Sequence, residues 1–283
     1  MNNLSLNFME AGLTVLFISL ELSQELNFLR YAAMTSGLGL NGWFTQIDDM
    51  ADRVRRYQAM HGNGSRGQLY VTRAPIGSRP SDVRALIKEF ELVTGKRPDA
   101  VFCDYLDIMG SDVRVPADNI SLKDKYAAEG LREIAHDNDL IMVTGSQIKK
   151  EAQDSVDIGV SQTAGGQSKV NTADVWGNIM MTSEMKAAGI AGIKWLKTRT
   201  SDGVNQVSLM QYNPVSMRLS NFDVPLSDAD VKRYTSLTQK VVKTTRASSG
   251  VEDRGPDQGP ELSKPSEGTL VSTLLSSMVD IDQ

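Results

Sequence analysis

Four mostly apolar runs of the sequence end in side chains that could take part in phosphate chemistry. The runs span residues 13–20, 101–103, 140–143 and 193–196, and the side chains that follow them are Glu21, Asp104, Gln147 and the pair Lys197 and Arg199. Runs of this kind are typical of buried strands in a parallel sheet. Because parallel strands bring their C-terminal ends to one edge, we expect these five side chains to converge in a single crevice.

The residue types suit the chemistry of a metal-bound phosphate. A carboxylate such as Asp104 can hold Mg²⁺ directly or through water, because hard cations take oxygen ligands. Glu21 could act as a general base, and the Gln147 amide can donate to a phosphate oxygen while it accepts from water. Ordinary structural roles also fit: a cap or turn residue for Asp104, a solvated strand end for Glu21 and a solvated strand face for Lys197 and Arg199.

Five blocks of the sequence resemble the C-terminal ATPase domain of DnaB-type hexameric replicative helicases, above all those of T-even-type bacteriophages. The blocks are VLFISLE at 15–21, DAVFCDYLDIMG at 99–110, LREIAHDNDLIMVTGSQIKKEAQDS at 131–155, the GGQ…TADVW run at 165–176 and IKWLKTRTSDG at 193–203. Each block is short, but the five follow one another in the order of the family over most of residues 1–222.

The resemblance implies an α/β fold, a RecA-like domain with a doubly wound, mostly parallel sheet flanked by helices, over residues 1–224. Residues 225–283 are expected to form a C-terminal helix and a disordered acidic tail, because residues 247–283 hold seven acids against two bases. The preceding residues balance at 28 acids and 28 bases. Nucleic acid would therefore be bound in a lined channel rather than on a broad basic face.

The resemblance also implies an activity: hydrolysis of Mg²⁺-bound ATP that drives translocation on single-stranded DNA as a homohexameric ring. By this comparison Glu21 orients the attacking water, Asp104 holds Mg²⁺, and Gln147 senses the γ-phosphate. Lys197 and Arg199 are implied to reach the nucleotide of the neighbouring subunit, where a trans arginine is worth roughly 10³–10⁵ in rate.

Two loops are implied to contact DNA. Near the first lie Arg114 and Lys123, and in the second, over residues 149–171, lie Lys149, Lys150 and Lys169. An ordinary surface charge is the alternative for each of these residues. A primase and a helicase loader are further partners that the family suggests, and the cytoplasm of the bacterial host is the expected location.

The phosphate-binding loop of the family, G-x-x-x-x-G-K-[S/T], does not occur in the 283 residues. Residues 2–12 resemble the helix that follows that loop, so we expect a domain truncated at its N-terminus, without the loop and an interior strand. The polypeptide alone is then expected to hydrolyse ATP negligibly and to be destabilised, aggregation-prone or dependent on a complementing fragment. Two alternatives stay open: a RecA-like recombinase or repair ATPase that forms filaments, and a non-catalytic split-gene subunit.

Composition excludes other classes of protein. Cys103 is the single cysteine and lies in a predicted core strand, so it is expected to be a small buried hydrophobe rather than a nucleophile. With two histidines and one cysteine, a zinc site is not expected. No apolar run is long enough to cross a bilayer and no cleavable signal pattern begins the chain, so we expect a soluble, intracellular protein with no membrane partner.

Local patterns predict the elements around the crevice. Helices are expected at 23–35, capped by Ser23, at 45–60, from Ser81 onward and from an N-cap at Ser121. The helix from Ser81 should bury one stripe, made of Val83, Leu86, Ile87, Phe90 and Val93. A strand is expected at 68–72, and the segments 206–210 and 217–219 should finish the same sheet. Further along, we expect a helix at 227–241, and the apolar segment at 270–279 is either a short helix that docks a partner or a frayed terminus.

Overall fold

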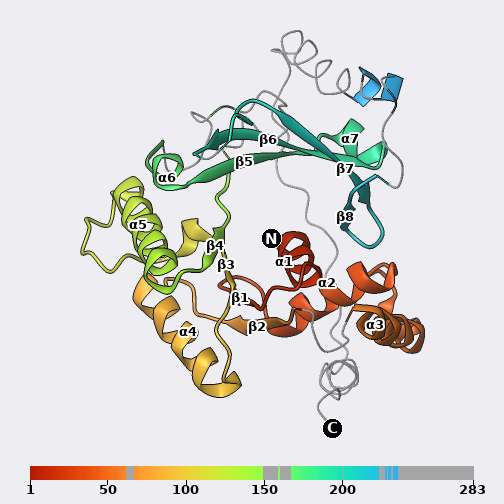
Figure 1. Ribbon diagram of the computed structural model, residues 1–283, viewed down its shortest axis with the longest axis horizontal. Helices are drawn as coiled ribbons and strands as arrows, with labels where there is room; N and C mark the ends of the chain where they lie inside the picture. The colour runs from red at the N-terminus through yellow and green to blue at the C-terminus, as the bar shows by residue number, and fades with distance from the viewer. Residues whose placement is uncertain are drawn as a thin grey trace, which may run out of the picture.

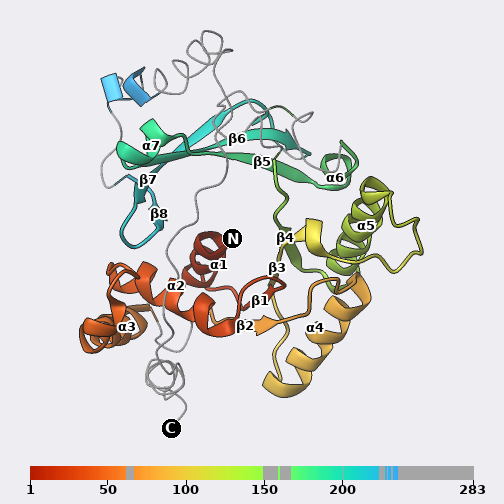
Figure 2. The ribbon, with the colours of Figure 1, turned by 180° about the vertical axis from the view of Figure 1, so that it is seen from behind.

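The computed structural model describes residues 1–61, 67–148, 159, 167–199, 201–222, 227, 229–230 and 232–234. These residues form two four-stranded sheets, one parallel and one antiparallel (Figure 1). Both ribbon views place the first turn of the N-terminal helix between the two sheets (Figures 1 and 2). No helix in the described part of the chain is long and apolar enough to cross a bilayer.

The parallel sheet has the strand order β2-β1-β3-β4. Its strands are β1 (Val15–Ser19), β2 (Leu69–Arg73), β3 (Ala100–Asp104) and β4 (Ile141–Thr144). All five residues of β1 are buried, as expected for a central strand covered on both faces. The register sets Ser19 opposite Arg73 on one side and opposite Asp104 on the other, so these strands end together at one edge.

Alternating residues of β1 and β3 face two different cores. Leu16, Ile18, Val101 and Cys103 pack with helices α4 (Pro80–Thr94) and α5 (Ile120–Asn138). Val15, Phe17, Ala100 and Phe102 pack with α1 (Asn2–Glu10) and α2 (Gln24–Ser36). This period of two, with helices on both faces, makes the sheet doubly wound and confirms the predicted α/β class.

The helices predicted to begin near residues 23, 45, 81 and 121 are present, with local differences. Ser23 caps α2 by accepting from the Leu26 amide, and the next helix is α3 (Ile47–His61). The helix after the central strand is capped by Asn119 rather than Ser121, because the Asn119 side chain accepts from the Leu122 amide at 3.0 Å. The predicted stripe of α4 was wrong at its end, where Val93 is 79% exposed. Two short 3₁₀ helices, η1 (Trp43–Thr45) and η2 (Leu106–Ile108), complete this half.

The antiparallel sheet has the order β5-β6-β7-β8. Its strands are β5 (Val175–Met180), β6 (Ile190–Thr198), β7 (Val207–Asn213) and β8 (Arg218–Ser220), with helices α6 (Gln167–Thr172) before β5 and α7 (Ser183–Ala187) between β5 and β6. We expected β6, β7 and β8 to continue the parallel sheet, and this was wrong. The links between these strands are too short for parallel crossovers, so successive strands pair antiparallel.

The two sheets are joined through helix α1. The Asn3 side chain donates to the Met217 carbonyl at 2.8 Å and accepts from the Leu219 amide at 2.8 Å. Arg218 pairs with Glu10 at 2.8 Å. These contacts fix the β7–β8 hairpin against the helix that also packs on β1.

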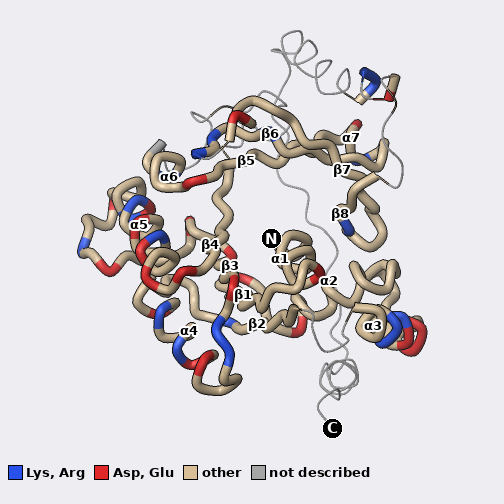
Figure 3. The backbone as a smooth tube through the Cα atoms, in the orientation of Figure 1, with Lys and Arg blue, Asp and Glu red and all other residues tan. Residues whose placement is uncertain are grey.

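Charged residues of both signs alternate over α3, α4 and α5 (Figure 3). This fits the balanced composition of the body of the chain. The predicted helix at 227–241 lies mostly outside the described residues; within it, residues 229–230 and 232–234 are helical, and Tyr234 stacks on Phe222 with ring centroids 5.9 Å apart. The segment 270–279 lies wholly outside the described residues.

Candidate active site

Asp104 ends the central strand β3 as a carboxylate without a partner. No hydrogen bond or ion pair of its side chain is found in the described part of the chain. Burial is the largest effect on the pKa of Asp104 and raises it, and the nearby Glu21 carboxylate raises it further, while the Met1 amino group and Arg30 act in the opposite direction. A desolvated acid next to a second acid at a sheet edge is the environment in which a bound cation would be stabilising.

Glu21 reaches the same edge through a turn after β1. The Ser19 hydroxyl donates to the Leu22 carbonyl at 2.8 Å and accepts from the Leu22 amide at 3.1 Å, which closes the turn. Glu21 is exposed, and its charge raises the pKa values of both Asp104 and Tyr105. The Glu21 carboxylate therefore lies close enough to the end of β3 to act on both groups.

Gln147 follows β4 and contacts the same group of residues. Its side-chain amide donates to the Tyr105 hydroxyl at 3.0 Å, and its backbone amide donates to Asp107 at 2.6 Å. Glu21, Asp104 and Gln147 thus meet around Tyr105 at the C-terminal edge of the parallel sheet. This convergence was predicted from the strand endings, whereas Tyr105, which lies between them, was not.

Lys197 and Arg199 do not lie at this edge, because β6 belongs to the antiparallel sheet. The Lys197 ammonium donates to the carbonyls of Val170 and Asn171 at 2.8 and 2.7 Å. The Arg199 guanidinium donates to the same Asn171 carbonyl at 3.2 Å and pairs with Asp174 at 3.3 Å. Arg199 follows directly after the last residue of β6, and both cations reach the same Asn171 carbonyl. Desolvation and the Arg199 charge lower the pKa of Lys197.

The residues predicted to contact DNA have different surroundings. Arg114 is exposed in the loop before α5. Lys123 points inward, where it donates to the Asp107 carbonyl at 2.7 Å and pairs with Asp124 at 3.0 Å. The prediction for Lys169 was wrong for this arrangement of the chain, since its side chain is 1% exposed and paired with buried acids. Lys149 and Lys150 lie outside the described residues.

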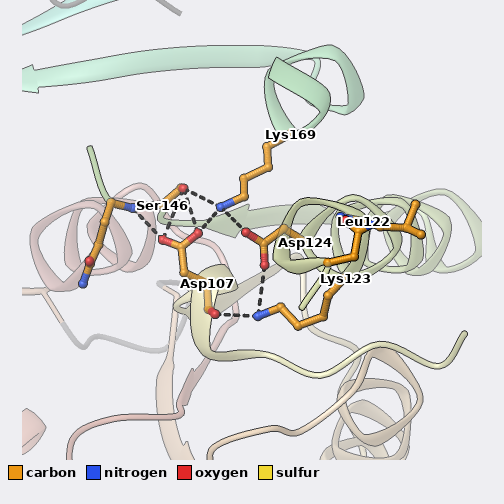
Figure 4. A network of polar contacts seen from close by, with 8 residues as sticks. Asp107, Leu122, Lys123, Asp124, Ser146 and Lys169 are labelled. Carbon is orange, nitrogen blue, oxygen red and sulfur yellow. Dashed lines mark hydrogen bonds and ion pairs between the residues drawn. The ribbon is translucent and has the colours of Figure 1, made fainter. Parts of the chain in front are cut away.

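A buried polar cluster next to the edge was missed by the sequence analysis (Figure 4). The Lys169 ammonium lies between the carboxylates of Asp107 and Asp124, at 2.7 Å from Asp124, and contacts the Ser146 hydroxyl at 3.1 Å. Asp124 is 1% exposed. One signal for it was available: residue 124 is in helical phase with the buried positions 127, 131 and 134 of α5.

The oxygen ligands at the edge suit Mg²⁺ better than a softer metal. No group of three or more His, Cys, Asp or Glu side chains that could hold a metal is found in the described part of the chain. Mg²⁺ needs only one or two carboxylates, because it keeps several waters and takes further oxygens from phosphate. Asp104, whose side chain has no hydrogen bond or ion pair within the described residues, fits that role, with the Glu21 charge nearby. Cys103 is fully buried, and burial raises its pKa to about 12, so it behaves as the core residue that was predicted.

Comparison with known proteins gives a consistent relationship. No family model matches the sequence. Over 206 residues the chain is 29% identical to the DnaB-like replicative helicase of Enterobacteria phage T4, an alignment that covers 71% of this chain and 42% of that protein. A solved DnaB-like replicative helicase, described with its interactions with primase, matches with a TM-score of 0.66 at 13% identity over 78% of this chain and 55% of that one.

The chain resembles the DnaB-like replicative helicases. A second solved structure, described as an ATPase domain, supports the same fold, with a TM-score of 0.65 at 14% identity over 77% of this chain and 78% of that domain. The chain therefore shares the fold of these two solved structures, in agreement with the α/β fold that the sequence blocks predicted. The chain spans less than half the length of the phage T4 DnaB-like protein.

Proposed function

We propose that this chain is the ATPase motor domain of a DnaB-like replicative helicase, which translocates on single-stranded DNA as a hexameric ring. The observation that carries the proposal is the desolvated Asp104 carboxylate, which has no partner in the described part of the chain and lies at the edge that Glu21 and Gln147 share. A structural acid in such a position would be expected to have a cation or a donor beside it.

The residues of the edge are assigned roles on this basis. Asp104 would hold Mg²⁺, which neutralises phosphate charge when it is bound. Glu21, exposed and near Asp104, would accept a proton from the attacking water. Gln147, held by Asp107 through its backbone and by Tyr105 through its side chain, would donate to a phosphate oxygen. Tyr105, which accepts from Gln147 and is affected by the Glu21 charge, would help to hold the Gln147 side chain near Glu21.

The two cations of β6 are proposed to act between subunits. Lys197 and Arg199 do not lie beside Asp104, and their role would be to contact a nucleotide on a neighbouring copy of the chain. Their present partners are backbone carbonyls of α6, with Asp174 for Arg199. Arg114, with Lys149 and Lys150, remains the proposed contact to DNA phosphates.

The phosphate cradle is the part of a nucleotide site that these residues do not supply. The 283 residues include no G-x-x-x-x-G-K-[S/T] loop. β4 and β5 are outer strands of their sheets, and Ile141, Val175 and Ile179 on them are 48, 52 and 59% exposed. Such edges can pair with another strand. A second candidate function follows, in which the chain is a subunit that hydrolyses ATP only when another segment completes the site.

An ATPase assay on two polypeptides tests both proposals. We expect residues 1–283 alone to show negligible turnover. Residues 1–283 preceded by the phosphate-loop segment of the phage T4 relative should hydrolyse ATP with Mg²⁺, faster when single-stranded DNA is added. In that polypeptide Glu21→Gln should lower kcat by roughly 10²–10⁴, while the matched control Glu25→Gln, an exposed acid in the first turn of α2, should leave it unchanged.

Two results would refute the assignment. Robust turnover by residues 1–283 that Glu21→Gln leaves intact would place the chemistry elsewhere. Filaments rather than closed rings, seen by electron microscopy with single-stranded DNA, would favour the recombinase or repair ATPase over the helicase.

A further inference from the structure

The buried cluster binds the chain on both sides of the segment 149–166. On the N-terminal side, the Asp107 carboxylate accepts from the Gln147 amide at 2.6 Å and from the Ser146 hydroxyl at 3.0 Å. On the C-terminal side, the same carboxylate accepts from the Lys169 ammonium in the first turns of α6. One carboxylate of η2 therefore fixes both Gln147 and α6.

The cluster is balanced in charge and mostly buried. Two acids, Asp107 and Asp124, face two cations, Lys123 and Lys169. Side-chain exposure is 18% for Asp107 and 1% for both Asp124 and Lys169. Removing one member of such a pair leaves an unpaired buried charge, which is far more costly than the intact pair is favourable. The arrangement thus favours one position of α6 over positions that are only slightly displaced.

Helix α6 depends on these contacts for its position. It has six residues, too few for a helix to be stable by itself. Val170 is buried at 3% exposure, and Lys169 supplies the buried polar anchor. A change at Lys169 should therefore move the whole of α6 rather than one side chain.

The far end of α6 is where the cations of β6 bind. Lys197 donates to the Val170 and Asn171 carbonyls, and Arg199 donates to Asn171. Arg132 of α5 donates to the next carbonyl, that of Thr172, and pairs with Asp174 at 2.9 Å. Free carbonyls at a helix C-terminus attract cations, so the position of α6 determines where these guanidinium and ammonium groups lie.

We propose that Asp107 and Lys169 are positioning residues that couple Gln147 to Lys197 and Arg199 through α6. The contacts form one continuous path: the Gln147 amide to Asp107, Asp107 to Lys169, and the carbonyls of α6 to the two cations. A movement of Gln147 at the edge of the parallel sheet would thereby be transmitted to the antiparallel sheet. The use of this coupling in ATP hydrolysis rests on the proposed function. The coupling between Gln147 and the two cations through α6 can exist without that function.

Hydrogen exchange on residues 1–283 tests the coupling without any nucleotide. Lys169→Met should accelerate exchange by roughly tenfold or more at three places at once: the Gln147 amide, the Ala173 amide that closes α6, and the Arg199 amide that donates to Asp174. Lys169→Arg should restore slow exchange at all three. The matched control is Lys186→Met on α7, an exposed lysine of a short helix, which should change none of them.

Several outcomes separate coupling from simple loss of structure. Acceleration confined to α6, with the Gln147 and Arg199 amides unchanged, would overturn the proposal, as would uniform acceleration along the chain that Lys169→Arg does not reverse. If Lys169→Met does not fold, Lys169→Met with Asp124→Asn, which restores the charge balance, is measured in its place under the same criteria.

Kinetics then test the use of the coupling. In the polypeptide that carries the phosphate-loop segment, Lys169→Met should lower kcat roughly tenfold or more with little change in the KM for ATP, because the proposed Mg²⁺ contact of Asp104 is kept while the cations proposed to act on the neighbouring nucleotide are displaced. An unchanged kcat would overturn the catalytic part of the proposal. Absence of turnover in the unmutated polypeptide would instead refute the proposed function, and the exchange result would still decide whether the coupling exists.

Discussion

Replacing Asp104 with Asn is expected to stabilise the folded domain at neutral pH. Burial and the Glu21 charge raise the pKa of Asp104 in the folded state. When the pKa of a carboxyl group is higher in the folded than in the unfolded state, the group stabilises the fold at pH values below its unfolded-state pKa. This stabilisation is lost as the pH rises through the folded-state pKa. Asn is nearly isosteric and carries no charge, so the variant escapes this loss.

The size of the effect follows from proton linkage. Between the ordinary pKa of 3.8 and the raised folded value, wild type should lose stability relative to Asn at up to about 1.4 kcal/mol per pH unit. At pH values above the folded pKa of Asp104, the stability difference between Asp104→Asn and wild type should stay constant. At pH values below the ordinary pKa, this difference should be smallest. The Met1 amino group and Arg30 act to lower the Asp104 pKa. They therefore narrow the pH range between the ordinary and the folded pKa, but the net pKa shift is still upward.

Urea unfolding followed by tryptophan fluorescence, at pH values from about 4 to 8, measures the difference directly. The control is Asp118→Asn, an exposed acid in the loop before α5, which should change the free energy of unfolding by no more than about 0.5 kcal/mol. The reasoning is refuted if Asp104→Asn is less stable than wild type at the upper end of the range. A stability gain of Asp104→Asn that stays the same across this pH range would also refute it.

Two further changes test the packing of α5. Leu131→Ala should cost about 2–5 kcal/mol in the free energy of unfolding, because this side chain is 2% exposed in the core. The control Val93→Ala on α4, where the side chain is 79% exposed, should cost no more than about 0.5 kcal/mol. Equal costs for the two variants would contradict the assignment of the core. Gly130→Ala should lower Tm even though Ala favours a helix by about 1 kcal/mol, since the new Cβ would lie 2.7 Å from two carbons of the Pro80 ring. A rise in Tm would show that α4 and α5 can separate without cost.

The parallel half of the fold could be predicted because its signals are local. Short apolar runs at 15–19 and 100–104 become strands buried on both faces, and the Ser at position 23 becomes a helix cap. Strand ends then follow from chain direction alone, which is why Glu21, Asp104 and Gln147 were placed together correctly.

The antiparallel half could not be assigned to its own sheet from the same signals. The apolar run before Lys197 looks the same whether its strand pairs parallel or antiparallel, since the choice depends on connections and on partners elsewhere in the chain. Lys169 shows the same limit for a single residue. A lysine in a polar stretch is normally solvated, and this one is buried because Asp107 and Asp124, 62 and 45 positions earlier, come to surround it.

The contrast among three acids is the strongest physical argument for a cation at the sheet edge. Asp107 and Asp124 each form ion pairs with lysines in the folded chain. Asp104 is desolvated as well, yet its carboxylate has no partner in the described part of the chain, and stability alone would favour a neutral residue there. If Mg²⁺ is the missing partner, Mn²⁺ used as its spectroscopic probe should bind wild type more tightly than Asp104→Asn, while Asp118→Asn binds as wild type does. Equal binding by all three would mean that the unpaired carboxylate serves no metal.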